Sequence, residues 1–313
     1  MTEAASTDRV LPFQTERSHL RGRLVRLGPL LSHILGRHDY PDAVARLLGE
    51  TALLAVALAS NLKYDGVFTL QVKGDGPVGL IVVDVVCGLV PSDIGPAART
   101  VRGVARFDRD AVAKMTADPH MLQMSLVGKG WLAFTVDQGP DTERYQGIVA
   151  LRGKTLAECV QHYFLQSEQL ATGITLAISN EIGLWNGTAL LLQRLPTDSE
   201  PPGTAPGTTD EDDWRRAMVL MATLGAAEML DPALADADLL WRLFHEDGVR
   251  VFDQNLLVPG CRCSRDKVSS TLRALDRTDV ESLREDGMVK VTCEFCNTEY
   301  RFDDRELTLL YDA

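Results

Sequence analysis

The stretch that decides how this chain is organised lies near its C-terminus and contains two close pairs of cysteines. It reads GCRCSRDKVSSTLRAL at residues 260–275 and VTCEFCNTEYRFDDREL at residues 291–307, with 29 residues between the two pairs. Four thiolates in two short pairs suit a tetrahedral Zn²⁺ site, because each pair can hold the ion from one side while the intervening chain folds back. The pattern therefore predicts one structural zinc ion per chain, held by Cys261, Cys263, Cys293 and Cys296.

The role of such a site stays open at the level of the residues. The block 256–313 has few large apolar side chains and should need a staple, which a structural zinc can provide with ~10 to 16 kcal/mol of apparent binding energy. A purely structural zinc module is one interpretation. A redox role is another, because a Cys-x-Cys pair can form a strained disulfide, and strained exposed disulfides are typically labile and regulatory. A thioredoxin-like motif fits less well, since it opens a helix in a βαβ unit and needs no second cysteine pair.

Residues 1–195 are predicted to form a mixed α/β domain with a largely antiparallel sheet. Runs of β-branched residues alternate with Gly-containing turns, and the turns KGDGPVG and GKGW are too short for a helical crossover. Helices are expected at 28–37, 40–62 and 155–170, and strands at 19–27, 67–73, 78–86, 100–107, 131–138, 145–151, 173–179 and 189–195. Because these turns imply antiparallel hairpins, the predicted class of the domain is α+β.

Residues 196–255 are predicted to connect that domain to the cysteine block 256–313. The first part, 196–213, concentrates Pro, Gly, Thr and acid and is expected to be a flexible or extended linker. Helical patterns follow at 214–230 and 237–252, after an acidic cluster that favours a helix N-terminus. The predicted fold is thus α+β, with a sheet domain, a helical connector and a small four-cysteine zinc domain.

Other motifs add no catalytic site. Gly74 to Gly79 matches GxGxxG by letter, but a strand rather than a helix is expected after it, so we interpret it as a hairpin turn. Cys87 and Cys159 lie in apolar runs and are expected to pack in the core, while His245 is expected to cap or solvate a helix end. With no nucleophile elbow, phosphate loop or His pair in the sequence, we expect no enzyme.

Composition limits the partners and the compartment. The 313 residues are 45% hydrophobic and carry a net charge of -12, which argues against non-specific binding to nucleic acid or anionic membranes. The N-terminus lacks the basic start and apolar run of a signal peptide, and the most apolar stretch is too short to span a bilayer. We therefore expect a cytoplasmic protein, in which clustered cysteines more often bind metal than form permanent disulfides.

The cysteine segments resemble the C-terminal zinc module of the heat shock protein 33 family of redox-regulated molecular chaperones. The resemblance continues, in the family's order, through RHDYPDAVARLLGE, FTLQVKGDGPVGLIVVD, RYQGIVAL, LAECVQHYFLQSEQL and LGAAEMLDPALADADLLWRLFHEDGVRVF, and so covers nearly the whole chain. It departs from the family at 196–213, which looks like an insertion beside the connector. That insertion puts in question how tightly the connector docks on the N-terminal domain.

The resemblance implies an ATP-independent holdase chaperone that is inactive while reduced and zinc-bound. Oxidation is then expected to pair Cys261 with Cys263 and Cys293 with Cys296, to release the zinc and to protect unfolding proteins from aggregation under oxidative stress. It also implies a homodimer formed through the N-terminal domain. Adaptable apolar side chains suit unlike clients. The connector residues expected to bind clients are Trp214, Met218, Met221 and Met229, although the same side chains could simply be the buried faces of helices.

Two other functions remain as alternatives. Four-cysteine ribbons often bind nucleic acid, but residues 256–313 carry 9 Lys and Arg against 12 Asp and Glu, the wrong sign for a phosphate-binding surface. A thiol-disulfide oxidoreductase is the third possibility. Catalytic turnover of a disulfide substrate would distinguish it from a chaperone that acts stoichiometrically.

Overall fold

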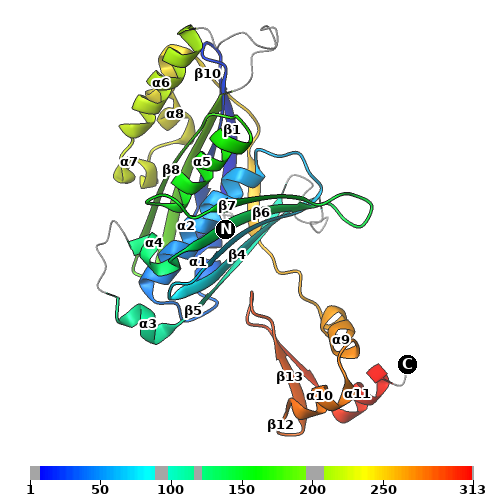
Figure 1. Cartoon of the computed structure of the whole chain (residues 1–313). Coiled ribbons are helices and arrows are strands. Elements are labelled where there is room, and N and C mark those ends of the chain that lie inside the picture. The colour runs from blue at the N-terminus through cyan, green and yellow to red at the C-terminus, as the bar shows by residue number, and fades with distance from the viewer. Residues whose placement is uncertain (1–7, 89–97, 116–121, 195–207, 312–313) are drawn as a thin grey trace, which may run out of the picture. The chain divides into compact units, whose positions relative to one another are not determined.

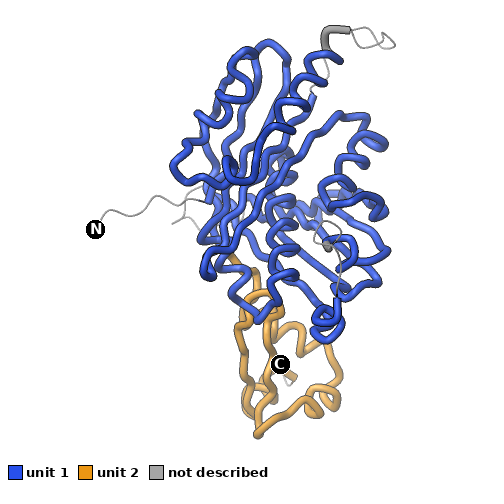
Figure 2. Tube along the Cα trace, turned by 90° about the vertical axis from the view of Figure 1, so that its left-hand side faces the viewer, with its two compact units in different colours: residues 1–259 blue, residues 260–313 orange. Residues whose placement is uncertain are grey.

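The computed structural model describes residues 8–88, 98–115, 122–194 and 208–311. The chain forms two compact units, residues 1–259 and residues 260–313 (Figure 2). The Pro-rich stretch, up to residue 207, lies outside the described residues. Its last part does not fit the predicted linker, because residues 208–213 form the start of a helix.

The larger unit is built on one long, mostly antiparallel sheet (Figure 1). Its strand order is β7-β6-β3-β4-β5-β11-β1-β2-β9-β8, with β10 also paired to β1. The strands are β1 (Arg9–Thr15), β2 (Leu20–Leu27), β3 (Gly66–Gly74), β4 (Val78–Cys87), β5 (Arg99–Phe107), β6 (Gly130–Asp137), β7 (Tyr145–Ala150), β8 (Thr172–Glu181), β9 (Leu184–Arg194), β10 (Val249–Val251) and β11 (Asn255–Pro259). The pairing of β11 with β5 is parallel, whereas the neighbouring pairs, β4 with β5 and β11 with β1, are antiparallel.

One face of the sheet is covered by the helices of the N-terminal half, α1 (Pro29–Leu35) and α2 (Asp42–Ala59). α2 is rich in Ala and Leu, which are strong helix formers, and it is apolar around most of its circumference. Such a helix must be buried, and α2 packs against strands from both halves of the sheet. The same core includes side chains of α4 (Leu122–Val127) and α5 (Leu156–Ser167), whereas the short α3 (Arg109–Ala113) has no buried residue.

The opposite face of β1, β2, β8 and β9 is covered by the helices of the connector. These are α6 (Thr208–Ala222), α7 (Ala226–Leu230) and α8 (Asp236–Phe244), which a short 3-10 turn, His245–Asp247, follows. Phe13, Leu24 and Leu190 from the sheet form one buried cluster with Phe244 of α8. The connector helices therefore belong to the same compact unit as the sheet.

The smaller unit has a three-stranded sheet, β12 (Arg284–Glu285), β13 (Met288–Thr292) and β14 (Glu299–Phe302), with three helices. The helices are α9 (Arg265–Arg273), α10 (Arg277–Ser282) and α11 (Asp304–Tyr311). Its buried apolar cluster, among the residues described, consists of Leu272, Val280, Val289, Phe302 and Leu307. A core of this size supplies little stability by itself, so the unit fits the expectation that it needs a staple.

The predicted α+β class with a largely antiparallel sheet is confirmed, and several local predictions need correction. β1 and β11 were not predicted. The segment 214–230 is two helices with a break at Gly225, and the helix expected over 237–252 ends at Phe244, since Gly248 has a φ of 70° and β10 follows. GKGW does not join two strands, because α4 precedes it. The GxGxxG match is indeed the β3–β4 turn.

Candidate metal and redox centre

The two cysteine pairs reach the same place from different parts of the smaller unit. Cys261 and Cys263 lie in the segment between β11 and α9. The Ser264 hydroxyl caps the first turn of α9. Cys293 and Cys296 lie in the turn that joins β13 to β14. The hairpin register, from Val289 opposite Phe302 to Thr292 opposite Glu299, leaves this second pair at its tip.

The tip of the hairpin is a tight turn that holds its two thiols on one side. The N–H of Asn297 donates to the carbonyl of Cys293 at 2.8 Å, and the N–H of Cys293 donates to the carbonyl of Thr298 at 2.9 Å. Asn297 has a φ of 57°, a left-handed conformation that Asn tolerates better than most residues. This reversal returns the chain into β14 immediately after Cys296.

The four sulfur atoms form one compact cluster. They all lie within 4.8 Å of one another, with Cys261 and Cys293 at 3.7 Å and Cys263 and Cys296 at 3.4 Å. A tetrahedral zinc bound at about 2.3 Å places its sulfurs about 3.8 Å apart, whereas a disulfide needs about 2.05 Å. None of these four cysteines forms a disulfide in this structure, and their arrangement fits a soft divalent metal.

The thiols of the cluster differ in acidity. Burial, together with hydrogen bonds from neighbouring thiols, raises the pKa of Cys263 to about 12, although the Tyr300 hydroxyl works against this. Burial also raises the pKa of Cys293. At Cys296 burial acts in the same direction, but hydrogen bonds from the Thr298 hydroxyl and N–H and from the other thiols outweigh it and lower the pKa to about 6. The lowered pKa favours the thiolate form of Cys296, and thiolates are the form that reacts with oxidants.

Two side chains beside the cluster were missed by the sequence analysis. The Tyr300 hydroxyl donates to the sulfur of Cys263 at 3.1 Å, and Oγ1 of Thr298 lies 3.2 Å from the sulfur of Cys296. Tyr300 lies in β14, two residues after Thr298, and in extended chain that spacing places side chains on the same side. This spacing is the signal that could have identified them.

The other cysteines and His245 belong to the larger unit and are not members of the cluster, as the sequence predicts. Cys159 is fully buried in α5, and Cys87 is half-buried at the end of β4. His245 caps the C-terminus of α8, where its ring lies 5.0 Å from that of Trp241.

The connector residues predicted to bind clients lie at the interface between the connector helices and the sheet. Met229 and Met221 are 1% and 5% exposed, and Trp214 and Met218 pack as half-buried side chains against the same cluster. Met218 fits over Gly173 of β8, where a side chain would come within 2.6 Å of its sulfur. The four side chains are therefore covered in this form of the protein.

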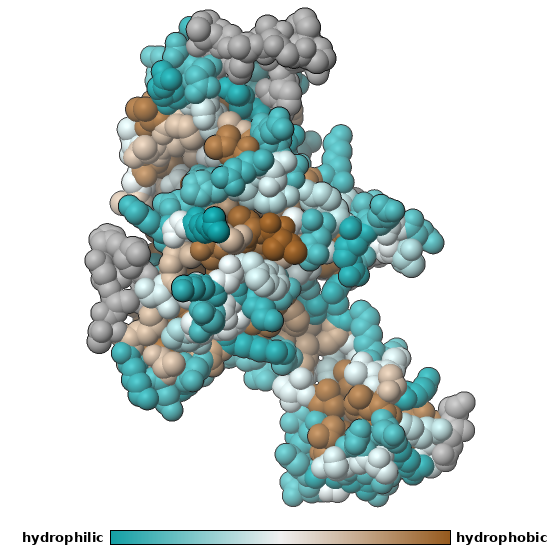
Figure 3. All heavy atoms as spheres, in the orientation of Figure 1, coloured by the Kyte–Doolittle hydropathy of each residue, from teal (hydrophilic) through white to brown (hydrophobic). Residues whose placement is uncertain are grey.

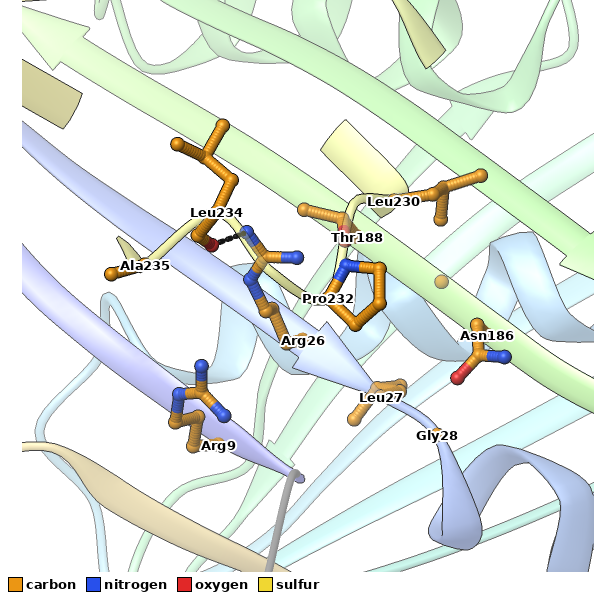
Figure 4. Close-up of a pocket in the computed structure, with 11 residues that line it drawn as sticks. Arg9, Arg26, Leu27, Gly28, Asn186, Thr188, Leu230, Pro232, Leu234 and Ala235 are labelled. Carbon is orange, nitrogen blue, oxygen red and sulfur yellow. Dashed lines mark hydrogen bonds between the residues drawn. The ribbon is translucent and has the colours of Figure 1, made fainter. Parts of the chain in front are cut away.

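A charged network, also missed by the sequence analysis, holds the connector to the sheet. Asp236, at the start of α8, accepts from Arg9 at 2.6 Å and from Arg26 at 2.5 Å. Figure 4 shows Arg26 reaching from β2 toward the connector, where it also donates to the main-chain oxygens of Met229 at 3.0 Å and Leu234 at 3.1 Å. One guanidinium thus bonds both the end of α7 and the start of α8.

The fold and the site together define a class, an α+β protein of two units that carries a four-thiol metal or redox centre. The model of the family described as Hsp33 protein matches residues 8–303. The 33 kDa chaperonin of Caulobacter vibrioides strain NA1000 is 39% identical over 95% of each chain, and that of Ectopseudomonas mendocina is 37% identical over 96% of this chain and 93% of its own. This chain belongs to the Hsp33 family of chaperones.

A solved structure has the same fold. The crystal structure of the 33 kDa chaperonin of Thermotoga maritima, described as a heat shock protein 33 homolog, superposes with a TM-score of 0.77. It is 22% identical and covers 97% of this chain and 98% of its own. Among the helices that the structure describes, none is long and apolar enough to cross a membrane.

Proposed function

We propose that this chain is a cytoplasmic, ATP-independent holdase chaperone that is inactive while its thiols are reduced and zinc-bound, and that oxidation activates it. The observation that carries this proposal is the cluster of four thiols within 4.8 Å, in a unit with a very small apolar core. Cys261, Cys263, Cys293 and Cys296 would hold one zinc ion, which when bound supplies folding energy and keeps the thiols apart. In this proposal, residues 1–195 bind clients and form the dimer, residues 196–255 form the connector, and residues 256–313 form the redox switch.

Oxidation converts the thiols from ligands into disulfides. When a pair of thiols reacts with hydrogen peroxide, one S–S bond forms, the pair loses two electrons and two protons, and the peroxide is reduced to two waters. The proposed pairs are Cys261 with Cys263 and Cys293 with Cys296. In the folded cluster, the sulfurs of Cys261 and Cys293 and those of Cys263 and Cys296 are in contact, but closing a loop is cheaper in entropy between near neighbours in the chain. Unfolding of the unit would therefore favour the local pairs.

The connector is the element that we propose responds to the switch. β11 ends at Pro259, two residues before Cys261, and the connector helices immediately precede β10 and β11 in the chain. Loss of structure in the smaller unit would thus begin next to the last strand that anchors the connector. Release of α6 to α8 would expose the apolar side chains of both the helices and the sheet, including Trp214, Met218, Met221 and Met229. This surface is suited to unfolding client proteins.

The experiment measures zinc content and suppression of aggregation of a heat-unfolded client on the same preparation, before and after treatment with peroxide and mild heat. About one zinc per chain, lost as protection appears, is the expected result. Loss of zinc without protection would show a purely structural site and refute the proposed switch. Mass spectrometric mapping of the oxidised protein tests the pairing, and sedimentation of the active form tests the homodimer.

A further inference from the structure

A second candidate site lies on the larger unit, beside the C-terminal end of α2. A cavity of about 590 Å³ opens there, a size typical of small-ligand sites. Its walls come from β3, β6 and β7 near one end of the strand order and from β2 and β9 near the other, with α5 in contact with both β7 and β8. None of its lining residues belongs to the cluster beneath the connector helices.

The floor of this cavity is aromatic and aliphatic. The rings of Phe68 and Phe134 stack at a centroid distance of 6.4 Å, and those of Phe134 and Phe164 at 6.2 Å. Leu58 and Leu170 also line the cavity. Nearby, Figure 3 shows apolar side chains gathered over the region of α5 and β7, where Ile148 and Leu165 are each 59% exposed. An apolar body would lose its contact with water on entering this space.

The mouth of the cavity carries excess positive charge. Arg21 and Lys63 line it, and across the described parts of the chain neither has a carboxylate partner. Arg21 donates instead to the amide oxygen of Gln193, at 3.0 Å. Arg23 lies close by, and burial together with the charges of Arg21 and Arg99 lowers its pKa to about 10, as expected where cations lack neutralising neighbours.

The acid at the mouth is already engaged. Glu168 accepts hydrogen bonds from the hydroxyls of Tyr145, at 2.7 Å, and Tyr163, at 2.8 Å. These bonds hold its carboxylate at the α5 side of the cavity. Arg21 of β2 and Lys63 of the loop after α2 also line the cavity.

We propose that this cavity binds a small amphipathic carboxylate, with its acyl tail on the phenylalanine floor and its carboxylate at Arg21 and Lys63. The cavity size and the apolar floor select the tail, and the unpaired cations at the mouth select a negative head group. The site is independent of the proposed chaperone switch, because its walls share no residue with the connector interface or with the cysteine cluster.

Isothermal titration of the reduced, zinc-loaded protein with decanoate, kept below its micellar concentration, tests the proposal. We expect one decanoate per chain. Octanoate should bind about tenfold more weakly, since each methylene contributes about 0.8 kcal/mol. Lys63→Glu should weaken decanoate binding about tenfold, because an attraction at the partly exposed mouth becomes a repulsion. The matched charge reversal Lys154→Glu, at an exposed site elsewhere, should leave it unchanged.

Three results would overturn the proposal. The first is absence of decanoate binding. The second is equal affinity for decanoate in wild type and Lys63→Glu, or equal affinity for decanoate and neutral decanol, either of which removes the head-group contact. The third is tighter binding of the neutral N-acetylphenylalanine amide, which would reassign the cavity to side chains of unfolded proteins. Thermal unfolding of both Lys variants checks that they fold.

Discussion

The larger unit buries two apolar clusters on the two faces of one sheet, whereas the smaller unit buries a handful of apolar side chains beside four thiols. Burial on that scale makes the larger unit stable without help, since area removed from water is the dominant favourable term in folding. In our proposal, the smaller unit depends instead on metal bonds to these sulfur atoms. Chemistry at those atoms can therefore unfold one unit while the sheet of the other persists.

The sharpest test of this difference removes one thiol. Cys293→Ser should abolish zinc binding and unfold residues 260–313, because most of the ~10 to 16 kcal/mol of apparent metal-binding energy is lost. Zinc content and limited proteolysis would follow the two units separately. The matched change in the larger unit, Cys87→Ser, should leave both readings as in the wild type. A Cys293→Ser protein that still binds zinc and resists proteolysis would contradict the contrast between the units.

A smaller effect is expected where the larger unit holds the connector. Asp236→Ala leaves Arg9 and Arg26 without their common partner, and breaking a mostly buried pair costs about 3 kcal/mol. The reduced variant should therefore suppress client aggregation without oxidant. Arg215→Ala, which breaks an exposed pair with Asp212, is the control and should stay inactive. Strict dependence of Asp236→Ala on oxidant would argue that the connector stays docked by packing alone.

The next effect concerns pH in the core of the larger unit. Burial raises the pKa of Glu50 from 4.5 to about 7, although Arg46 works in the opposite direction. The folded state then binds a proton that the unfolded state releases between pH 4.5 and 7, so stability falls as pH rises through this range. Glu50→Gln should remove that loss, about 3 kcal/mol for a shift of this size, so the melting temperature should fall less between pH 5 and pH 8 than it does in the wild type. Glu143→Gln, at an exposed carboxyl, should have no such effect, and parallel pH profiles for wild type and Glu50→Gln would refute the assignment.

The smallest effect lies beside the thiols. Tyr300→Phe removes the hydroxyl that donates to the sulfur of Cys263, and loss of such a supporting bond should weaken zinc affinity about tenfold. Competition with a chelator measures the change. Tyr311→Phe is the matched control, since its hydroxyl donates to the carbonyl of Leu272 instead. Equal zinc affinity in both variants would mean that the hydroxyl of Tyr300 does not support the ligand.

Prediction from sequence succeeded where the signal is local. The apolar run at 40–62 predicted a helix that the structure has as Asp42–Ala59, and the hairpin turn at Gly74 to Gly79 was recognised by its residues. β1 and β11 were missed because Pro12 and Pro259 weaken their strand signal, and β11 also pairs only with strands that lie far away in the chain. The end of α8 was misplaced because the apolar pattern continues past Gly248 into β10.

The candidate site, like the fold, could be predicted only where the signal is local in the sequence. The two cysteine pairs are visible in the sequence, and their convergence follows from the chemistry of a four-thiolate site. The bonds from Arg26 to Asp236 and to the carbonyl of Leu234 join residues more than two hundred positions apart, and no local pattern marks such a contact. The cavity at the end of α2 is hidden for the same reason, since each of its walls comes from a different element.

β11 joins the two halves of the large sheet, because it lies between β5 and β1 in the strand order. It is also the only strand of that order that comes from beyond residue 250 in the parts of the chain that the structure describes. A chain under synthesis can thus form β7-β6-β3-β4-β5 and β1-β2-β9-β8 as separate blocks before residues 255–259 leave the ribosome. Until then the inner edges of both blocks are open to other chains. The order of translation makes the seam of the sheet among the last parts of the molecule to close, just before the thiols emerge.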